Sequence, residues 1–291
     1  MILNISGRTN IVAFYTEWLI NRLEEGFVDV RNPYNHQLVS RIYFKDVDAY
    51  VFCTKNPLPI INHLNKFDKP IIFQITLTPY KKDLEPNIIP KNLIIEGIKE
   101  ISKIIGIENI YVRYDPIIIN DIYSIVYHKK AFEKMCGLLD GYVNKIIVSF
   151  VDEYKNVLNN KKVLNHRSLS ELEYQEIGQS FYAIASKHHM SVQTCYEEHN
   201  LVEYGFINDV CVSKQLIFKL TGKNFKKWNA RKCNCVEMVD IGYYNSCKHF
   251  CKYCYANYDE KKVNSNFDKH NLHSSLLIGE LEEDDIIKVR S

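Results

Sequence analysis

The chain has 291 residues, of which 46% are hydrophobic and 25% charged, and its formal net charge is +2. This composition is ordinary for a globular protein with a sizeable core, and the near-neutral charge excludes an overall field that would recruit nucleic acid or a membrane. The sequence lacks an apolar run of transmembrane length and a signal-peptide pattern, so we expect a cytoplasmic protein with no membrane partner. In a reducing compartment, the nine cysteines indicate metal ligands or reactive thiols before disulfides.

Short runs rich in Val, Ile, Phe and Tyr alternate with helical patterns along the chain. The predicted strands are 2–6, 49–54, 71–78, 109–115, 145–151, 190–196 and 236–244. The predicted helices lie near 11–25, 57–66, 91–105, 121–139, 170–189 and 212–221, with Asn10, Asn120 and Ser170 as N-caps and Gly26, Gly106 and Gly222 at helix ends. Six or seven βα units in series predict an α/β fold built on a parallel barrel or open sheet.

We expect a single barrel-like domain over residues 1–260, because no linker rich in Gly, Pro or Ser interrupts the βα rhythm. A cysteine-rich segment at about 197–237 is predicted to form a cap. Residues 261–291 are predicted to form a C-terminal tail that wraps back onto the fold.

In folds of this class, ligands bind beyond the carboxyl ends of the strands. Polar residues at or after these ends are the first site candidates. They are Ser6, Arg8, Thr9, Thr54, Lys55, Asn56, Gln74, Thr76, Thr78, Arg113, Asp115, Ser149, Asp152, Gln193, Thr194, Cys195 and Glu197.

The run CKHFCKYC places Cys247, Cys251 and Cys254 on one short loop after the last predicted strand. Three thiolates can hold three irons of a [4Fe–4S] cube and leave the fourth iron open. A structural zinc site would normally need four protein ligands. The alternative is therefore zinc bound by these cysteines together with His249 or with one of Cys233 and Cys235.

This spacing, Cys-x3-Cys-x-aromatic-Cys with Tyr253 as the aromatic residue, resembles the signature of radical S-adenosylmethionine (SAM) enzymes. The resemblance implies a [4Fe–4S] cluster whose open iron binds SAM, a reductant such as flavodoxin or ferredoxin, and a 5′-deoxyadenosyl radical that removes hydrogen from the substrate. It also implies that Tyr253 lies by the adenine. In that superfamily the motif usually follows the first strand, so the resemblance implies a circularly permuted, partial (βα)6-7 barrel.

A closer resemblance extends over nearly the whole chain. The segments that carry it include RTNIVAFYTEWLINRLEEGFVDVRNPYN, VFCTKNP, FQITLTPYKKDLEPN, VRYDPII, IVSFVDEY, QTCYEEHNL and DIGYYNSCKHFCKYCYANY. Together they look like a bacterial family of unassigned function that has a cysteine motif near its C-terminus and is loosely similar to spore photoproduct lyase. Gly7, Asn10 and Cys53 depart from that family's usual residues, whereas the cysteine signature matches it.

Four further cysteines, Cys195, Cys211, Cys233 and Cys235, lie in or beside the predicted cap. Four thiolates are a complete ligand set for a second iron–sulfur cluster. A four-cysteine zinc site and unrelated buried thiols are the alternatives. We interpret the other two cysteines, Cys53 and Cys136, as core residues.

By the same resemblance, Arg113 and Asp115 are expected to contact the SAM carboxylate and ribose, although a simple salt bridge explains the pair almost as well. Gln74 and Ser149, at two other predicted strand ends, are further candidates for cofactor binding. The expected substrate is a nucleic-acid base, a small molecule or a peptide. The rival interpretation is a non-catalytic zinc- or iron–sulfur-binding protein that serves as a structural module, a sensor or an electron carrier.

Overall fold

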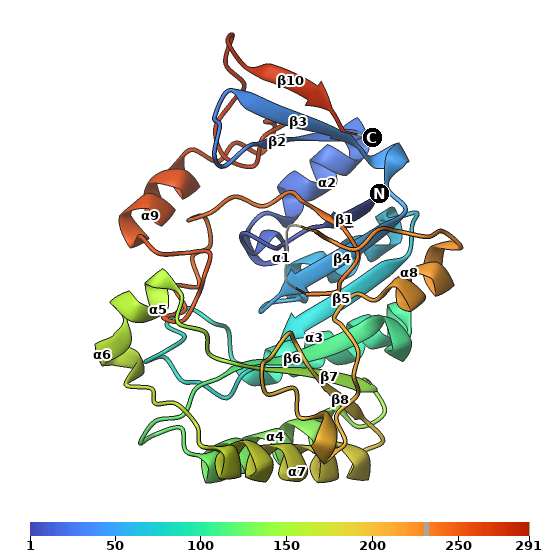
Figure 1. The fold of residues 1–291 in the computed structure, drawn as a ribbon. Coiled ribbons are helices and arrows are strands. Elements are labelled where there is room, and N and C mark those ends of the chain that lie inside the picture. Colours follow the sequence, from blue (N-terminus) through green and yellow to red (C-terminus); the bar gives the residue numbers. More distant parts are fainter. Residues whose placement is uncertain (230–232, 291) are drawn as a thin grey trace.

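A computed structural model describes residues 1–229 and 233–290 of the chain. Its largest element is a seven-stranded sheet in the order β8-β7-β6-β5-β4-β1-β9, in which every neighbouring pair is parallel (Figure 1). The strands are β1 (Ile2–Asn4), β4 (Ala49–Thr54), β5 (Ile71–Thr76), β6 (Ile110–Ile117), β7 (Lys145–Phe150), β8 (Ser191–Thr194) and β9 (Val239–Asp240). The predicted α/β class and all seven predicted strands are confirmed.

Both faces of this sheet are covered, which explains why its strands consist of nearly continuous apolar runs. Tyr50 and Phe52 of β4 belong to an apolar cluster formed with the surrounding helices. Val51, between them, belongs to a second cluster that includes Ile217 of α8 (Lys214–Thr221). Part of the predicted cap segment therefore packs against one face of the sheet.

The predicted helices are present, although the one predicted over 57–66 is a 3-10 helix (η2), and two of them need further correction. The range 11–25 divides at Tyr15 into two helices, and the helix predicted from 121 begins at Ile125. The side chain of Ser124 caps it, while Asn120 Oδ1 instead accepts turn hydrogen bonds from two following backbone N–H groups. The helices and 3-10 turns are α1 (Ile11–Phe14), α2 (Thr16–Glu25), η1 (Phe44–Asp46), η2 (Leu58–Lys66), α3 (Lys91–Ile105), η3 (Ile107–Asn109), α4 (Ile125–Leu139), α5 (Lys155–Asn159), α6 (Lys161–Leu164), α7 (Glu171–Lys187), η4 (Val202–Tyr204) and α9 (Glu260–Asp268).

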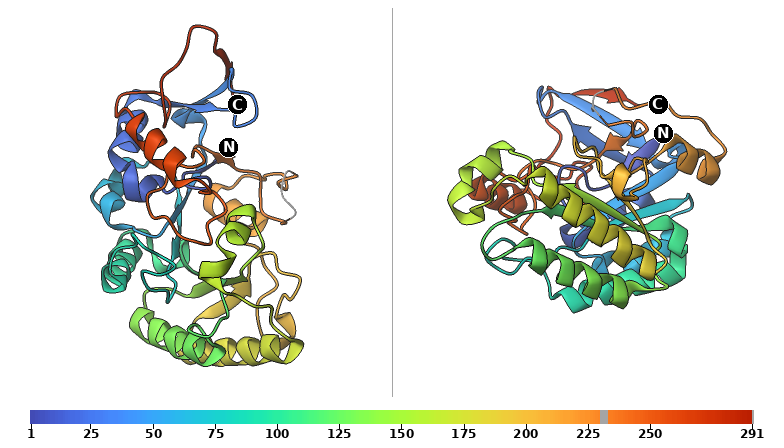
Figure 2. Two further views of the ribbon diagram at one scale, coloured as in Figure 1. Left: turned by 90° about the vertical axis from the view of Figure 1, so that its left-hand side faces the viewer. Right: turned by 60° about the horizontal axis from the view of Figure 1, so that its bottom comes forward.

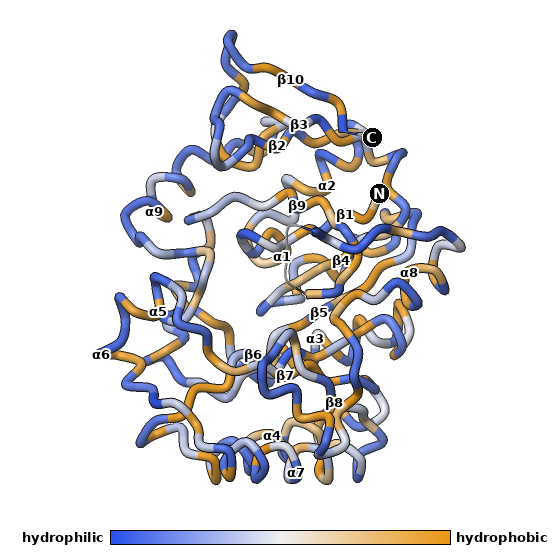
Figure 3. The backbone as a smooth tube through the Cα atoms, viewed as in Figure 1, coloured by the Kyte–Doolittle hydropathy of each residue, from blue (hydrophilic) through white to orange (hydrophobic). Residues whose placement is uncertain are grey.

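A second, three-stranded sheet was not predicted from the sequence. It consists of the antiparallel pair β2 (Phe27–Arg31) and β3 (Leu38–Tyr43), with β10 (Ile286–Val289) parallel to β3. The C-terminal segment thus returns to the N-terminal part of the fold. Phe267 of α9 packs against Phe14 of α1, and Figure 2 shows the two helices from a second side. Figure 3 shows that α9 is largely hydrophilic, and its Val263 is buried.

The last strand of the large sheet in chain order lies beside the first. Leu3 pairs with Val239 and Asn4 with Asp240, so β9 extends the sheet next to β1. The strand order ends at β8 on one side and at β9 on the other, so the described residues form an open parallel sheet. None of the described helices is both long and apolar enough to cross a bilayer.

Candidate metal centres

Cys247, Cys251 and Cys254, referred to below as the triplet, lie on the loop that follows β9. Cys247 and Cys251 are buried and Cys254 is half-buried. Because β9 is parallel to β1, its carboxyl end meets the same edge of the sheet as the ends of the neighbouring strands. The loop therefore brings three thiols to the edge where ligands bind in parallel α/β folds.

Surrounding segments hold the triplet loop through hydrogen bonds to its backbone, so its course does not depend on its own residues alone. These contacts come from α1 and α2, from the segment between β5 and α3, from α5 and α6, and from residues just beyond the loop. They are Tyr15 Oη to Ser246 O (2.5 Å), Asn87 Nδ2 to Lys248 O (2.7 Å), Lys252 N to Leu84 O (3.0 Å), Asn160 Nδ2 to Lys252 O (2.9 Å), Asn156 Nδ2 to Cys254 O (2.9 Å) and Asn257 Nδ2 to Cys247 O (2.6 Å).

Backbone N–H groups lie against the triplet sulfurs. Burial raises the pKa of the Cys247 thiol to about 12, and the N–H groups of His249 and Asn10 act in the opposite direction. Burial also raises the pKa of the Cys254 thiol, and a hydrogen bond from the N–H group of Ala256 offsets part of this rise. Donors directed at sulfur favour the thiolate, which is the form that binds metal. The donor set therefore fits metal-bound thiolates.

His249 is already engaged by protein groups. Its Nε2 lies 3.1 Å from Asn10 Nδ2, and its Nδ1 lies 3.4 Å from the carbonyl oxygen of Asn87. A neutral ring with its proton on Nδ1 satisfies both contacts, and burial lowers the pKa of His249 to about 4. This arrangement argues against the alternative in which His249 completes a zinc site with the triplet.

A buried ionic cluster lies against the triplet, and its central residue, Glu85, was missed by sequence analysis. The Glu85 side chain is 0% exposed and accepts a hydrogen bond from Lys55 Nζ at 2.9 Å, and it also bonds Lys91 and the hydroxyl of Tyr253. Burial raises the pKa of Glu85, but the two lysines outweigh it and lower the pKa to about 2. Two ammonium groups share one carboxylate, so this cluster carries a net positive charge.

Lys55 connects the ionic cluster to the triplet. Its ammonium group lies 5.3 Å from the ring centroid of Tyr253, directly before the last triplet cysteine. Burial raises the pKa of the Cys251 thiol, and the positive charge of Lys55 offsets part of this rise. The sequence predicts that Lys55, at a strand end, could bind an anionic substrate or the SAM carboxylate. Glu85 lies in a loop without distinctive spacing, so sequence alone did not reveal its pairing with Lys55.

Four predicted cofactor-binding residues form one connected network. Arg113 Nε donates to Asp115 Oδ2 at 2.9 Å, and Arg113 Nη1 donates to Gln74 Oε1 at 3.1 Å. Ser149 Oγ donates to the other carboxylate oxygen of Asp115. Burial raises the pKa of Asp115, but its charged neighbour Arg113 outweighs it, and the net shift is downward.

This network contacts the second set of thiols. Arg113 Nη1 lies 3.3 Å from Cys211 Sγ, and Gln74 Nε2 donates to Cys211 O at 3.2 Å. Cys211 Sγ in turn lies 3.1 Å from Cys195 Sγ. Arg113 and Gln74 thus contact the second set of thiols. The charge of Lys55, which lies near the triplet, also lowers the pKa of Asp115.

Within residues 1–229 and 233–290, no group of three or more His, Cys, Asp or Glu side chains is already arranged to hold a metal ion. Two other strand-end candidates, Arg8 and Thr9, pair with residues of β9 and of the triplet loop. Arg8 Nε donates to Asp240 Oδ1 at 2.8 Å, and Ser246 Oγ donates to Thr9 Oγ1 at 2.8 Å. These pairs join the first predicted strand end to β9 and to the start of the triplet loop.

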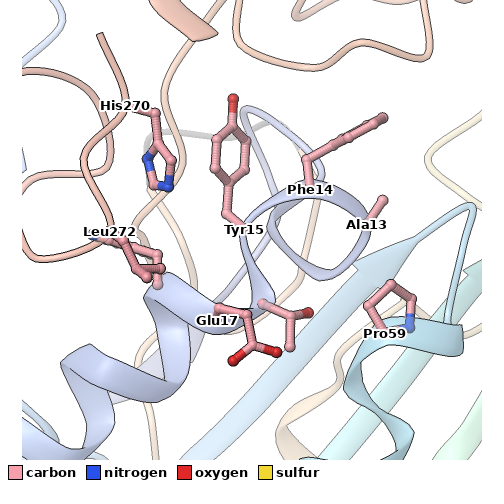
Figure 4. Close-up of a pocket in the computed structure, with 9 residues that line it drawn as sticks. Ala13, Phe14, Tyr15, Glu17, Pro59, His270 and Leu272 are labelled. Atoms are coloured by element: carbon pink, nitrogen blue, oxygen red, sulfur yellow. The ribbon is translucent and has the colours of Figure 1, made fainter. Parts of the chain in front are cut away.

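A small pocket lies between the start of α2 and the C-terminal segment (Figure 4). Its wall includes Phe14, Tyr15, Glu17, Pro59 and His270. The residues that line it include none of the predicted site residues, but Tyr15 in its wall also holds the triplet loop through its hydrogen bond to Ser246 O.

Fold and site together define an α/β protein with a parallel sheet and two sets of cysteines. Residues 2–256 match the family described as Domain of unknown function (DUF1848), and the chain belongs to that family. A comparison with curated proteins found no match. The match agrees with the predicted membership of a family of unassigned function, and its description assigns no activity.

Proposed function

We propose that this chain is a radical SAM enzyme in which Cys247, Cys251 and Cys254 hold a [4Fe–4S] cluster with one iron open to SAM. Bound there, the cluster would supply the electron that cleaves SAM to a 5′-deoxyadenosyl radical, which abstracts hydrogen from a substrate. A flavodoxin- or ferredoxin-like reductant is the expected partner. The substrate class is a nucleic-acid base, a small molecule or a peptide.

The observation that carries this proposal is that the three triplet thiols lie together on one loop while the candidate fourth ligands are engaged elsewhere. His249 is held by Asn10 and Asn87. Cys235, another candidate, lies beside Cys211 in the second set. Three protein thiolates without a fourth ligand are what a cube with an open iron requires, whereas structural zinc is normally closed by four.

The strand order supports the permutation that the proposal requires. The triplet follows β9, which is last in the chain but lies at the sheet edge, next to β1. In the usual superfamily order, the motif follows the first strand of the chain. Here it follows the last strand, β9, but β9 occupies the edge position next to β1, so the motif keeps its place relative to the rest of the sheet. The usual spatial arrangement is thereby compatible with the unusual position in the sequence.

The contacts also suggest different roles for the two cations. Lys55 lies by Tyr253 and influences Cys251, so in the proposed enzyme it supplies positive charge for an anionic group bound at the triplet. Arg113 contacts Asp115 and Cys211 instead. We therefore assign the carboxylate of SAM to Lys55 in preference to Arg113.

The proposal is tested by reconstituting the protein anaerobically with iron and sulfide, adding dithionite and SAM, and measuring 5′-deoxyadenosine by liquid chromatography. The wild-type protein should release it, and Cys251→Ala should release none. Cys136→Ala is the matched control, because Cys136 is a buried residue of α4 within the apolar core. It should behave like the wild type.

Three results would contradict the proposal. Persistent 5′-deoxyadenosine in Cys251→Ala would show that the triplet is not the site of cleavage. A colourless protein that holds zinc and takes up no iron would favour the non-catalytic zinc module. An iron–sulfur protein that releases no 5′-deoxyadenosine would favour a sensor or electron carrier.

A further inference from the structure

Four cysteines outside the triplet meet on the face of the large sheet that the cap segment covers. Cys195 directly follows β8, Cys211 precedes α8, and Cys233 and Cys235 follow α8. All four belong to, or pack against, the same apolar cluster. Three separate parts of the chain must therefore fold together to assemble this thiol set.

The four thiols form a continuous series of contacts. Cys211 Sγ lies 3.1 Å from Cys195 Sγ. The Cys211 thiol is also within hydrogen-bonding reach of Cys235, which in turn reaches Cys233. Sulfurs around a tetrahedral zinc ion lie about 3.8 Å apart, given Zn–S bonds of about 2.3 Å. The Cys195 and Cys211 sulfurs are already somewhat closer than this spacing, so at this pair the two side chains would only have to separate slightly around a metal ion.

Backbone hydrogen bonds fix the positions from which these side chains extend. Cys195 N donates to Val148 O at 2.9 Å, in continuation of the β8 pairing with β7. Cys235 O accepts a hydrogen bond from Trp228 N at 2.9 Å, and Val236 N donates to Val212 O at 3.0 Å. The hydrogen bond between Val236 and Val212 joins the residue after Cys235 to the residue after Cys211.

A half-buried cation, Arg113, accompanies the thiols. Arg113 Nη1 lies 3.3 Å from Cys211 Sγ, and Arg113 also reaches Cys195. A guanidinium keeps its positive charge under all ordinary conditions, and positive charge beside a cysteine favours the thiolate. Unrelated core thiols behave as small hydrophobic groups, and they need neither mutual contact nor a half-buried arginine. The cation is thus a separate observation that points to thiolate ligands.

We propose that Cys195, Cys211, Cys233 and Cys235 form a second, closed metal centre in which all four ligands are protein thiolates. Zinc and a [4Fe–4S] cluster share this ligand requirement. Such a centre joins the cap segment to the end of β8. It goes beyond the proposed function, because it requires neither SAM nor an open coordination position.

Metal content in three single variants tests the second centre. Wild type, Cys235→Ala, Cys251→Ala and the control Cys136→Ala are purified anaerobically, and zinc, iron and sulfide are measured per chain. The Cys235→Ala variant should lose about one zinc, or about four irons with their sulfide, relative to wild type. Cys251→Ala should retain the metal that Cys235→Ala loses. Whether Cys235→Ala loses zinc or iron identifies the metal that the second centre binds.

Cobalt(II) titration of metal-free wild-type protein avoids any variant that fails to fold. A four-thiolate site should give intense thiolate-to-cobalt and tetrahedral d–d absorption at one equivalent. Weak octahedral absorption in wild type, or equal metal content in wild type and Cys235→Ala, would overturn the inference. If Cys251→Ala retained this metal while wild type cleaved no SAM, the proposed function would fail and the second centre would stand.

Discussion

The two thiol sets differ in how the chain builds them. The triplet lies on one loop, whereas the four cysteines from Cys195 to Cys235 come from three segments that meet only in the folded protein. Each set has its own half-buried cation, Lys55 near Cys251 and Arg113 beside Cys211. A local motif can therefore be read from spacing alone, but a set assembled by topology requires the fold.

The number of ligands separates the two sets chemically. Among the described residues, the candidate fourth ligands His249 and Cys235 are engaged elsewhere, so the triplet suits an open, reactive metal centre, whereas four thiols suit a closed one. The network that joins Arg113 to Asp115 also brings Asp115 under the influence of Lys55. The two sets are thus neighbours, each with its own nearest cation, and the charges of both cations act on Asp115. Of the following changes, those at Glu85 and Tyr253 should affect the triplet more than the second set.

The largest expected effect is that of Glu85→Gln, which removes the carboxylate between Lys55 and Lys91. Lys55, whose side chain is 14% exposed, and Lys91, which is 31% exposed, then lose their partner, so the free energy of unfolding should fall by about 3 kcal/mol. Urea unfolding measures this loss. Iron retention at the triplet should fall as well, while metal at the second set stays unchanged.

The matched control for that variant is Glu260→Gln. Glu260 forms an ion pair with Lys252 at 2.9 Å, and its side chain is 65% exposed. An exposed pair contributes at most about 1 kcal/mol. Equal losses of stability in the two variants would show that the buried cluster does not support the triplet.

Acid should affect the sheet and its helices independently of both thiol sets, through His128 on α4. This buried ring lies 2.8 Å from Tyr114 Oη and 3.0 Å from Ile118 O, and burial lowers its pKa from 6.5 to about 4. Because the folded pKa is below the unfolded one, its stabilising contribution is complete above about pH 6.5 and is lost as the pH falls towards 4.

The expected loss across this window is about 2–3 kcal/mol, measured by urea unfolding at pH 7 and at pH 4. His128→Gln should show a flatter pH dependence in the same window. The effect of His128→Gln on the pH dependence of the unfolding free energy should be the same in Cys251→Ala and Cys235→Ala backgrounds. If this effect disappears in either background, His128 is coupled to that thiol set.

The smallest expected effect is that of Tyr253→Phe. It removes one hydrogen bond to Glu85 but keeps the ring beside Lys55, so the free energy of unfolding should fall by about 1 kcal/mol. Iron loss to a chelator, followed by absorbance, should be slightly faster at the triplet. Unchanged stability with unchanged iron loss would mean that the hydroxyl does not help to position the loop.

The sequence was sufficient to predict the large sheet, because strands buried on both faces are continuous apolar runs such as residues 49–54 and 71–76. It was not sufficient for β2, β3 and β10. All four side chains of β10 are exposed, and its partner β3 lies almost the whole chain length away, so no local apolar pattern marks it.

The same contrast holds at the site. The spacing of the triplet was visible in the sequence, and the count of four cap cysteines suggested a second set. Glu85 was not visible, because its importance comes from Lys55, Lys91 and Tyr253, which the fold brings to it from three other segments. Arg113 was expected to contact SAM, and only the structure places it against Cys211.

The most direct test of the central claim is an EPR spectrum of the triplet with and without SAM. Cys235→Ala is reconstituted anaerobically and reduced with dithionite, so that the triplet is the remaining thiol set. We predict the signal of a reduced [4Fe–4S] cluster whose shape changes when SAM is added, and its absence when Cys251→Ala is combined with Cys235→Ala. A cluster signal that SAM leaves unchanged, or one that persists in this double variant, would contradict an open iron held by the triplet.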